Sequence, residues 1–274
     1  NYQKIIRFIQ SFAVFFRYGI LRKIGLQEEI RMKWKMPLAL LLSAAMLFCA
    51  TGCEKQEDSR LTATQSTELY QLQEPEDGAT MAIVHTTMGD ISFVLYEEQA
   101  PKTCQQFIDL VNEGFYTDRD IYGIEMGNVF TGSEDHGGIQ GKTTAENGRG
   151  YEPETDPGLW QFTGAVCAYG ERDGVYERTV LADSRFFMVS EVEADPEVVS
   201  YMEENNYPEN VIQAYQEIGG NPITSGSFTV FGQVVEGLDV LNAIAAVPTE
   251  EDSIYPSTPM YVTSIELSEY HREG

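Results

Sequence analysis

The stretch Phe228–Ile244, read as FTVFGQVVEGLDVLNAI, restricts the fold of this 274-residue chain more than any other. Its first eight residues are mostly β-branched or aromatic, which is typical of a buried strand. Gly237 then interrupts the pattern. Apolar residues recur after it at the spacing of one helical face, at Leu238, Leu241 and Ile244. We predict a strand, a tight turn and a short helix, a unit that occurs in many α/β and α+β domains.

The two parts of the chain differ sharply in charge. Eight of the 18 basic residues but only two of the 43 acidic residues fall within positions 1–53, so positions 54–274 carry a net charge of −31. A surface this acidic repels phosphate backbones, and we therefore expect no nucleic-acid partner. The charge favours solubility and does not bear on the fold.

Residues 32–53, MKWKMPLALLLSAAMLFCATGC, have the three parts of a secretory signal: lysines, an apolar core and small residues before a cysteine. The ending resembles a bacterial lipoprotein box, which implies lipidation of Cys53. We expect export and anchoring to the outer face of the bacterial cytoplasmic membrane. An ordinary signal peptide or an uncleaved anchor is the alternative. Residues 1–31 are interpreted as an upstream extension rather than a membrane arm.

Residues 54–80 are rich in Glu, Gln, Ser and Thr and have no apolar periodicity. This composition predicts a flexible tether between the membrane anchor and a domain that occupies positions 81–268.

The pattern of cysteines and histidines gives no support for a metal site, and we expect no cofactor. Two of the four cysteines belong to the signal segment, whereas Cys104 and Cys167 fall in apolar segments. Two buried free thiols are expected, with a disulfide as the alternative in an exported protein. The sequence has no Cys-x-x-Cys or His-x-x-His spacing.

The domain begins with a predicted hairpin over positions 81–95, with Gly89 in its turn. Pro101 then stands at the favoured first position of a helix, and Gly114 ends that helix. A loop is expected over 169–183, and an insertion over 195–220 contains two helices that begin at Pro196 and Pro208.

A final strand is expected over 260–267. Its alternation places four residues on one face, namely Tyr261, Thr263, Ile265 and Leu267.

Several of these segments resemble the cyclophilin-type peptidyl-prolyl isomerases. The run from Phe228 is similar to the family's aromatic-x-V-F-G-x-V-x-x-G-x-D-V, and GDISFVLYEEQAPKTCQQF to its G-D-I-x-x-x-L and A-P-K-T-x-x-N-F. The string SRFFMV (184–189) is similar to S-Q-F-F-I. The resemblance covers about Met81–Leu267. It implies a mainly-β fold, a closed eight-stranded antiparallel barrel capped by helices, with the insertion as a helical hairpin.

Rotation about a prolyl bond crosses a barrier of about 18–20 kcal/mol that amide resonance sets. No bond breaks, so a dry pocket for the proline ring and a cation near the imide nitrogen suffice as catalysts. The resemblance implies that the arginine of F-H-R-V-I-P-G-F-M-I-Q-G-G-D supplies the cation. In this chain the motif falls on Ile121–Glu134, and Gly123 stands at the arginine position.

The pocket positions also depart from the family pattern. Asn128 stands where the motif has Phe, Val129 where it has Met and Thr131 where it has Gln. The resemblance implies a peptide pocket lined by Asn128, Val129, Phe130, Thr131, Ala168, Tyr169, Phe187, Ile223 and Phe228.

Two functions follow. The first is an isomerase that assists the folding of exported proteins by acting on their proline-containing segments. Its activity is expected to be weak, because losing a charge-assisted donor in a dry site costs about 10²–10³ in rate. The second is a binding module of the same fold in which catalysis has lapsed.

Arg185 stands where the family has Gln, next to the two phenylalanines of SRFFMV. Either its guanidinium reaches the groove and replaces the missing cation, or it is a surface arginine that neutralises acidic neighbours. If it replaces the cation, Arg185→Ala abolishes proline-isomerase turnover in a protease-coupled peptide assay. Unchanged turnover in that variant excludes the replacement.

Overall fold

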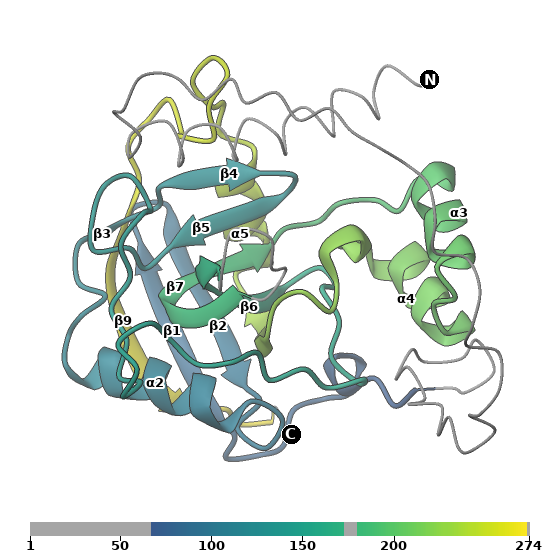
Figure 1. Ribbon diagram of the computed structural model, residues 1–274, viewed down its shortest axis with the longest axis horizontal. Coiled ribbons are helices and arrows are strands. Elements are labelled where there is room, and N and C mark those ends of the chain that lie inside the picture. Colours follow the sequence, from purple (N-terminus) through teal and green to yellow (C-terminus); the bar gives the residue numbers. More distant parts are fainter. Residues whose placement is uncertain (1–66, 173–179, 273–274) are drawn as a thin grey trace, which may run out of the picture. The chain divides into compact units, whose positions relative to one another are not determined.

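A curled antiparallel sheet of nine strands organises the part of the chain that the computed structural model describes, residues 67–172 and 180–272 (Figure 1). The strand order is β3-β9-β1-β2-β8-β6-β7-β5-β4. The strands are β1 Thr80–Thr86, β2 Gly89–Leu95, β3 Arg119–Asp120, β4 Gly123–Glu125, β5 Asn128–Thr131, β6 Ala165–Arg172, β7 Val180–Val189, β8 Val230–Glu236 and β9 Tyr261–Glu269.

The two end strands of this sheet, β3 and β4, are consecutive in the chain and separated only by Ile121 and Tyr122. Within the described residues no ladder of hydrogen bonds joins β3 to β4. The mainly-β antiparallel architecture is therefore as predicted, whereas the closed eight-stranded barrel is not confirmed.

Four α-helices accompany the sheet in the described residues: α2 Pro101–Asn112, α3 Pro196–Glu204, α4 Glu209–Ile218 and α5 Leu238–Ala245. Two short 3₁₀ turns, η1 Tyr70–Leu72 and η2 Pro222–Thr224, complete the elements. In Figure 1, α2 lies along one end of the sheet and the α3–α4 hairpin lies to one side. Within the same residues no helix combines the length and the apolar character that a membrane span requires.

The strand, turn and helix predicted over Phe228–Ile244 are confirmed as β8 and α5. Gly237 joins them with φ +79°, a left-handed conformation that favours glycine. A Cβ at this position would also collide with the carbonyl oxygen of Asp90 on the neighbouring strand. Both the backbone angle and the close approach therefore require glycine here.

The predicted hairpin is also confirmed, with Thr86 of β1 opposite Gly89 of β2. The predicted first helix begins at Pro101 and ends one residue before Glu113, its C-terminal cap. Cys104 on this helix and Cys167 on β6 are both buried free thiols, as expected.

The prediction that Tyr261, Thr263, Ile265 and Leu267 share one face of β9 was wrong. Tyr261 is exposed, whereas Val262 is fully buried. The pairing with β1 shifts register between His85 and Thr86, so one extra residue of β9 sits opposite this point. Such a bulge reverses the alternation of faces, and Val262 and Ile265 point inward as a result.

The loop expected over 169–183 was wrong at both ends, because β6 continues to Arg172 and β7 begins at Val180; positions 173–179 lie outside the described residues. All ten residues of β7 are buried. Asp183 therefore lies within a buried strand rather than in a loop.

The insertion forms the predicted pair of helices and builds a cluster of its own. Asp195 caps α3 by accepting hydrogen bonds from two backbone N–H groups, and Pro196 is the first helical residue. The buried members of this insertion cluster are Leu69, Phe162, Met202, Val211, Ala214 and Tyr215.

Leu69 shows that part of the expected tether packs against the domain. Gln71, two residues later, donates to the Gln233 side chain at 2.8 Å and accepts from the Trp160 backbone N–H at 2.6 Å. Two residues of the segment interpreted as a tether, Leu69 and Gln71, are therefore packed against the domain. The remainder of the tether, the signal segment with Cys53 and residues 1–31 lie outside the described residues and stay predictions.

Phe162→Ala tests whether the insertion contributes to the stability of the whole domain. Phe162 is fully buried, and its ring centroid lies 4.6 Å from that of Tyr215 on α4. We expect the variant to lose about 3–5 kcal/mol of unfolding free energy in chemical denaturation. The half-buried Tyr201→Ala serves as the control and should cost much less. A loss in Phe162→Ala as small as that expected for Tyr201→Ala would show that the insertion cluster does not stabilise the domain.

Candidate functional site

The outer face of the sheet carries a row of apolar side chains. Residues paired across strands share a face. Phe130 of β5 is paired with Phe187 of β7, which is paired with Cys167 of β6. Cys167 is in turn paired with Val230 of β8. These residues belong to an apolar cluster that is separate from the inner core.

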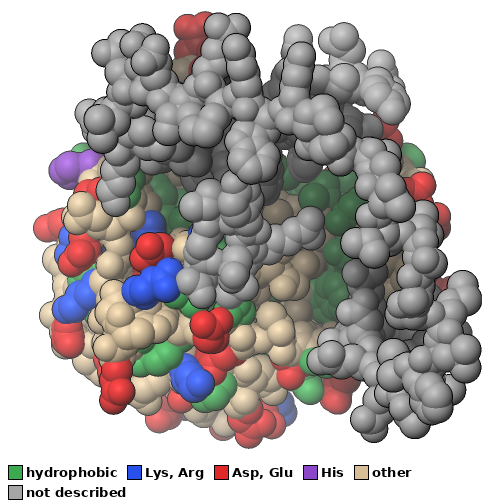
Figure 2. All heavy atoms as spheres, in the orientation of Figure 1, with side chains coloured by type: hydrophobic (Ala, Val, Ile, Leu, Met, Phe, Trp, Pro, Cys, Tyr) green, Lys and Arg blue, Asp and Glu red, His purple; other side chains and the backbone are tan. Residues whose placement is uncertain are grey.

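Seven aromatic side chains of the described residues belong to this cluster, and we call five of them the outer aromatic cluster: Tyr122, Phe130, Tyr169, Phe187 and Phe228. Four of the rings form a closed circuit. Its centroid distances are 5.1 Å (Phe130 to Phe187), 5.1 Å (Phe187 to Phe228), 6.0 Å (Phe228 to Tyr169) and 5.5 Å (Tyr169 to Phe130). Tyr122 lies beside Phe130 at 6.2 Å. On the side drawn in Figure 2, hydrophobic side chains gather in a hollow between the sheet and the α3–α4 hairpin.

The four consecutive residues predicted to line the pocket on β5 do not face the same way. Phe130 lies in the outer aromatic cluster, and Asn128, two residues earlier, shares its face. Val129 belongs to the inner core, and the Thr131 hydroxyl donates to the carbonyl of Asp120 at 2.9 Å. Successive strand residues point to opposite faces, so only two of the four can line an outer groove.

The same alternation separates the other predicted pocket residues. Ala168 lies in the inner core, whereas Tyr169 and Phe187 lie in the outer aromatic cluster. Phe228 packs against that cluster from the segment before β8. Ile223 lies half-buried in η2 and is a member of neither cluster.

Gly123, at the arginine position, is buried under a loop. The Ile124 backbone N–H donates to the carbonyl of Ile254 at 2.8 Å, which ties β4 to the segment that leads into β9. A Cβ on Gly123 would lie 2.9 Å from the Ile254 Cδ1 atom and 3.4 Å from the Phe130 ring. An isoleucine side chain therefore occupies the space that the absent arginine would enter.

Arg185 is neither a surface residue nor a free donor to the groove. Its side chain is 7% exposed and that of Asp183 is 4% exposed. The guanidinium Nε donates to both oxygens of Asp183 at 3.0 and 3.2 Å, and Nη2 forms the third contact with the same carboxylate. Nη1 donates to the carbonyls of Gly138 and Ile139, each at 2.9 Å. The interpretation as a surface arginine was wrong, because a buried ion pair engages most of its donors.

This ion pair changes how the Arg185→Ala experiment is read. Removing one partner of a buried pair typically costs about 3–5 kcal/mol, because the other charge stays buried. A loss of turnover in that variant therefore has to be compared with its loss of stability before any catalytic role is assigned.

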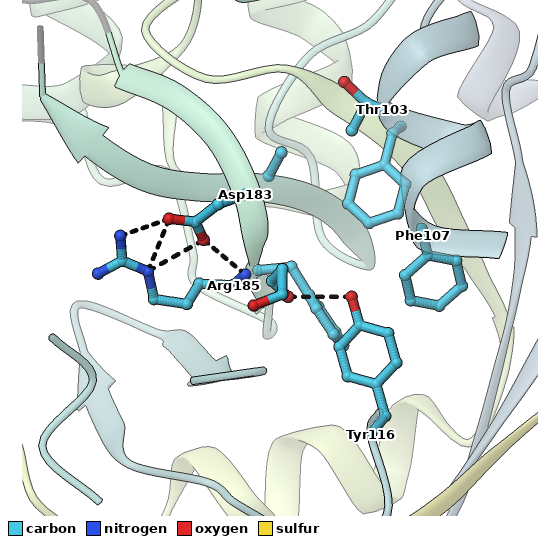
Figure 3. A pocket seen from close by; sticks show the side chains of 9 residues that line it. Thr103, Phe107, Tyr116, Asp183 and Arg185 are labelled. Atoms are coloured by element: carbon cyan, nitrogen blue, oxygen red, sulfur yellow. Dashed lines mark hydrogen bonds and ion pairs between the residues drawn. The ribbon is translucent and has the colours of Figure 1, made fainter. Parts of the chain in front are cut away.

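The small cavity beside the ion pair is not a peptide pocket. Figure 3 shows Asp183 and Arg185 on one side of it and Thr103, Phe107 and Tyr116 on the other. The Tyr116 hydroxyl donates to the carbonyl of Ser184. The cavity offers about 10 Å³, which is room for about one water molecule. It lies between α2 and β7, on the inner side of the sheet.

The electrostatics of the outer face favour neutral phenols. Burial raises the pKa of Tyr122 well above its ordinary value, and the Arg185 guanidinium only partly opposes this. Burial likewise raises the pKa of Tyr169. Both hydroxyls therefore keep their protons at neutral pH and can donate hydrogen bonds. Within the described ranges no three His, Cys, Asp or Glu side chains converge as a metal site would require.

Sequence reasoning missed the contributions of Asp183 and Ile254. Asp183 sits two residues before Arg185, the spacing that places both on one face of a strand, but a loop was predicted there. Ile254 approaches Gly123 from a segment distant in sequence, and no local pattern indicates that contact.

Glu125, which pairs with Asn128 across β4 and β5, gives a pH test of this edge of the sheet. Burial raises the pKa of its carboxyl, so the folded state holds this proton at a higher pH than the unfolded state does. Stability from this group is present below the ordinary Glu pKa and is lost as pH rises through the folded pKa. We expect Glu125→Gln to raise the unfolding free energy near pH 7 and to leave it unchanged below about pH 4. A gain of equal size at both pH values would contradict the assigned cause.

Residues 81–267 match the family model described as cyclophilin type peptidyl-prolyl cis-trans isomerase. The chain belongs to this family. The cyclophilin domain thus comprises the curled sheet, its helices and the insertion, and the outer aromatic cluster lies on it.

Curated relatives agree with this assignment. The chain is 29% identical over 164 residues to a protein of Staphylococcus saprophyticus that is assigned as a peptidyl-prolyl cis-trans isomerase, covering 60% of this chain and 79% of that protein. It is 26% identical over 199 residues to a protein of Staphylococcus epidermidis with the same assignment. That match covers 72% of this chain and 95% of the relative.

Solved structures show the same fold. A cyclophilin type peptidyl-prolyl cis-trans isomerase of Cryptosporidium parvum is similar with a TM-score of 0.53 at 19% identity, over 69% of this chain and 98% of that chain. A crystal structure of the same protein in the presence of the dipeptide Ala-Pro gives a TM-score of 0.52 at 19% identity. The similarity covers 68% of this chain and 96% of that chain.

Proposed function

We propose that this cyclophilin domain binds proline-containing segments of unfolded exported proteins on the outer aromatic cluster and accelerates their cis–trans exchange only weakly. The observation that carries the proposal is the closed circuit of four aromatic rings on the outer face of the sheet. Aromatic faces offer an apolar, rigid contact surface to a pyrrolidine ring. Family membership and the Ala-Pro dipeptide present with the related structure support proline segments as the ligand class.

The proposed location rests on the sequence of residues 32–53, with Cys53 as the lipidated residue. An anchored domain would meet its clients as they leave the membrane. Uncatalysed exchange of prolyl bonds takes about 10–100 s, so even modest acceleration would shorten the folding of such clients.

Weak activity follows from the missing cation. Gly123 carries no side chain, and Ile254 occupies the adjoining space. The Arg185 guanidinium is held by Asp183 and by two backbone carbonyls, which leaves it little capacity to bind a prolyl amide. An apolar groove without a charged donor holds proline but stabilises the twisted amide poorly.

A second candidate is a binding module without catalysis. The contact between Ile254 and Gly123 favours this candidate, because the Ile254 side chain fills the space next to the position where the family motif has its arginine. Binding and turnover therefore have to be measured separately.

Exchange NMR on a short peptide with one central Ala-Pro bond measures both quantities with the full chain. We expect saturable shifts of the peptide resonances and an exchange rate at least 10²-fold below that of an arginine-containing cyclophilin. Phe228→Ala, which opens the aromatic circuit, should weaken binding about tenfold. Tyr201→Ala on the insertion is the matched control and should leave it unchanged.

A double variant separates the two candidates. Gly123→Arg alone is expected to destabilise the domain, since the new side chain meets Ile254. Gly123→Arg with Ile254→Ala makes room for the cation and should raise turnover at least tenfold. Turnover near that of an arginine-containing cyclophilin in the unaltered chain would contradict the proposed weakness. Absence of peptide binding would contradict both candidates.

A further inference from the structure

Residues 67–73, which we call the strap, lie on the outer face of the sheet and precede the residues that match the family model. The Gln71 side chain donates to that of Gln233 on β8 at 2.8 Å. Gln233 pairs with Ala165 of β6, a member of the apolar cluster on the outer face, and paired residues share a face. The half-buried Tyr70 packs against the same cluster. The strap therefore covers one end of the face on which the groove is proposed.

The strap is also attached to the insertion. The Asn210 side chain on α4 accepts from the Thr67 backbone N–H at 3.4 Å and donates to the Thr67 carbonyl at 2.7 Å. Leu69 is buried in the insertion cluster, whereas Tyr70, the next residue, packs against the outer face. The strap therefore joins the insertion to the end of the proposed groove.

Side chains make every hydrogen bond between the strap and the described remainder of the domain. The backbone–backbone hydrogen bonds of residues 67–73 run from Leu72 to Leu69 and from Gln73 to Tyr70, so they stay within the strap. Detachment of the strap therefore breaks no ladder of the sheet. Segments with few hydrogen bonds to the core are those that open locally while the remainder of a domain stays folded.

Packing and charge act on the strap in opposite directions. A Cβ on Gly158 would lie 2.5 Å from both the Glu68 carbonyl oxygen and the Tyr70 ring, so the strap packs directly on the backbone there. The Asp156 carboxylate raises the pKa of Tyr70 most, and those of Glu68 and Glu98 add to this effect. Carboxylates of the strap and of the domain thus stand around one ring, and their repulsion opposes closure.

We propose that the strap is an autoinhibitory cover, which closes one end of the groove until a long client segment displaces it. The strap meets the sheet at Gln233, opposite Ala165, which lies two residues before Cys167 on β6, or about 6.6 Å along the strand. Cys167 pairs with Phe187 of the aromatic circuit. A proline with one neighbour on each side fits the circuit beside the closed strap, whereas a longer segment reaches the strap. The inference rests on the proposed function and adds a regulation to it.

Asn210→Ala tests the cover, because it frees the start of the strap and leaves the outer face unaltered. A cover that is closed most of the time lowers the apparent affinity by the fraction of open molecules. We expect the full chain with this change to bind a leucine-flanked decapeptide with a central Ala-Pro bond about three- to tenfold more tightly in NMR shift titration. The affinity for the tetrapeptide Ala-Ala-Pro-Ala, which spans about 13 Å, should not change.

Gln213→Ala is the matched control. Gln213 is an exposed amide on the same helix, and its side chain donates to Glu217 rather than to the strap. Both peptides should bind this variant as they bind the unaltered chain. Tyr70→Ala removes the covering ring without any change to α4, and it should show the same selective gain for the decapeptide.

The Trp160 backbone N–H reports the position of the strap directly, because it donates to the Gln71 side chain at 2.6 Å. We expect the decapeptide, but not the tetrapeptide, to accelerate hydrogen exchange of this amide in the unaltered chain. Asn210→Ala should accelerate the exchange without any peptide, and Gln213→Ala should not.

The outcomes distinguish this inference from the proposed function. If the unaltered chain binds both peptides but neither Asn210→Ala nor Tyr70→Ala binds the decapeptide more tightly, the strap is a fixed wall and the inference is overturned, while the groove still stands. Unchanged exchange of the Trp160 amide on decapeptide binding overturns it as well. If neither peptide binds the unaltered chain or the two strap variants, the proposed function and the inference fall together.

Discussion

Strand β7 is buried on both faces, and the remainder of the structure depends on this constraint. All ten of its residues are buried. Phe186 and Met188 point into the inner core, whereas Phe187 and Val189 point to the outer face. A strand that is apolar on both sides needs cover on both sides. The inner core provides one cover, and the outer aromatic cluster provides the other.

The same strand explains why the Arg185 guanidinium is not an unpaired cation on the outer face. Asp183 and Arg185 lie on the outer face of β7 and neutralise each other there. Arg185 also holds the 138–139 backbone through two hydrogen bonds. Gly123 is covered by Ile254, so this position adds no charge to the apolar outer face.

Local patterns predicted the elements well where one short-range rule applied. Gly237 between β8 and α5, Pro101 at the start of α2 and the hairpin around Gly89 each depend on backbone geometry that a few neighbouring residues decide. The buried face of β9 was mispredicted, because the bulge opposite Thr86 arises from pairing with a strand distant in sequence.

By itself the sequence determined the family, the order of the elements and the absence of an arginine at position 123, since these are properties of residue type and spacing. Only the tertiary structure decided which neighbours of that position face the groove. The alternation of β5 divides Asn128 and Phe130 from Val129 and Thr131. Burial of the Asp183–Arg185 pair and the arrival of Ile254 beside Gly123 depend on long-range packing, which no local pattern contains.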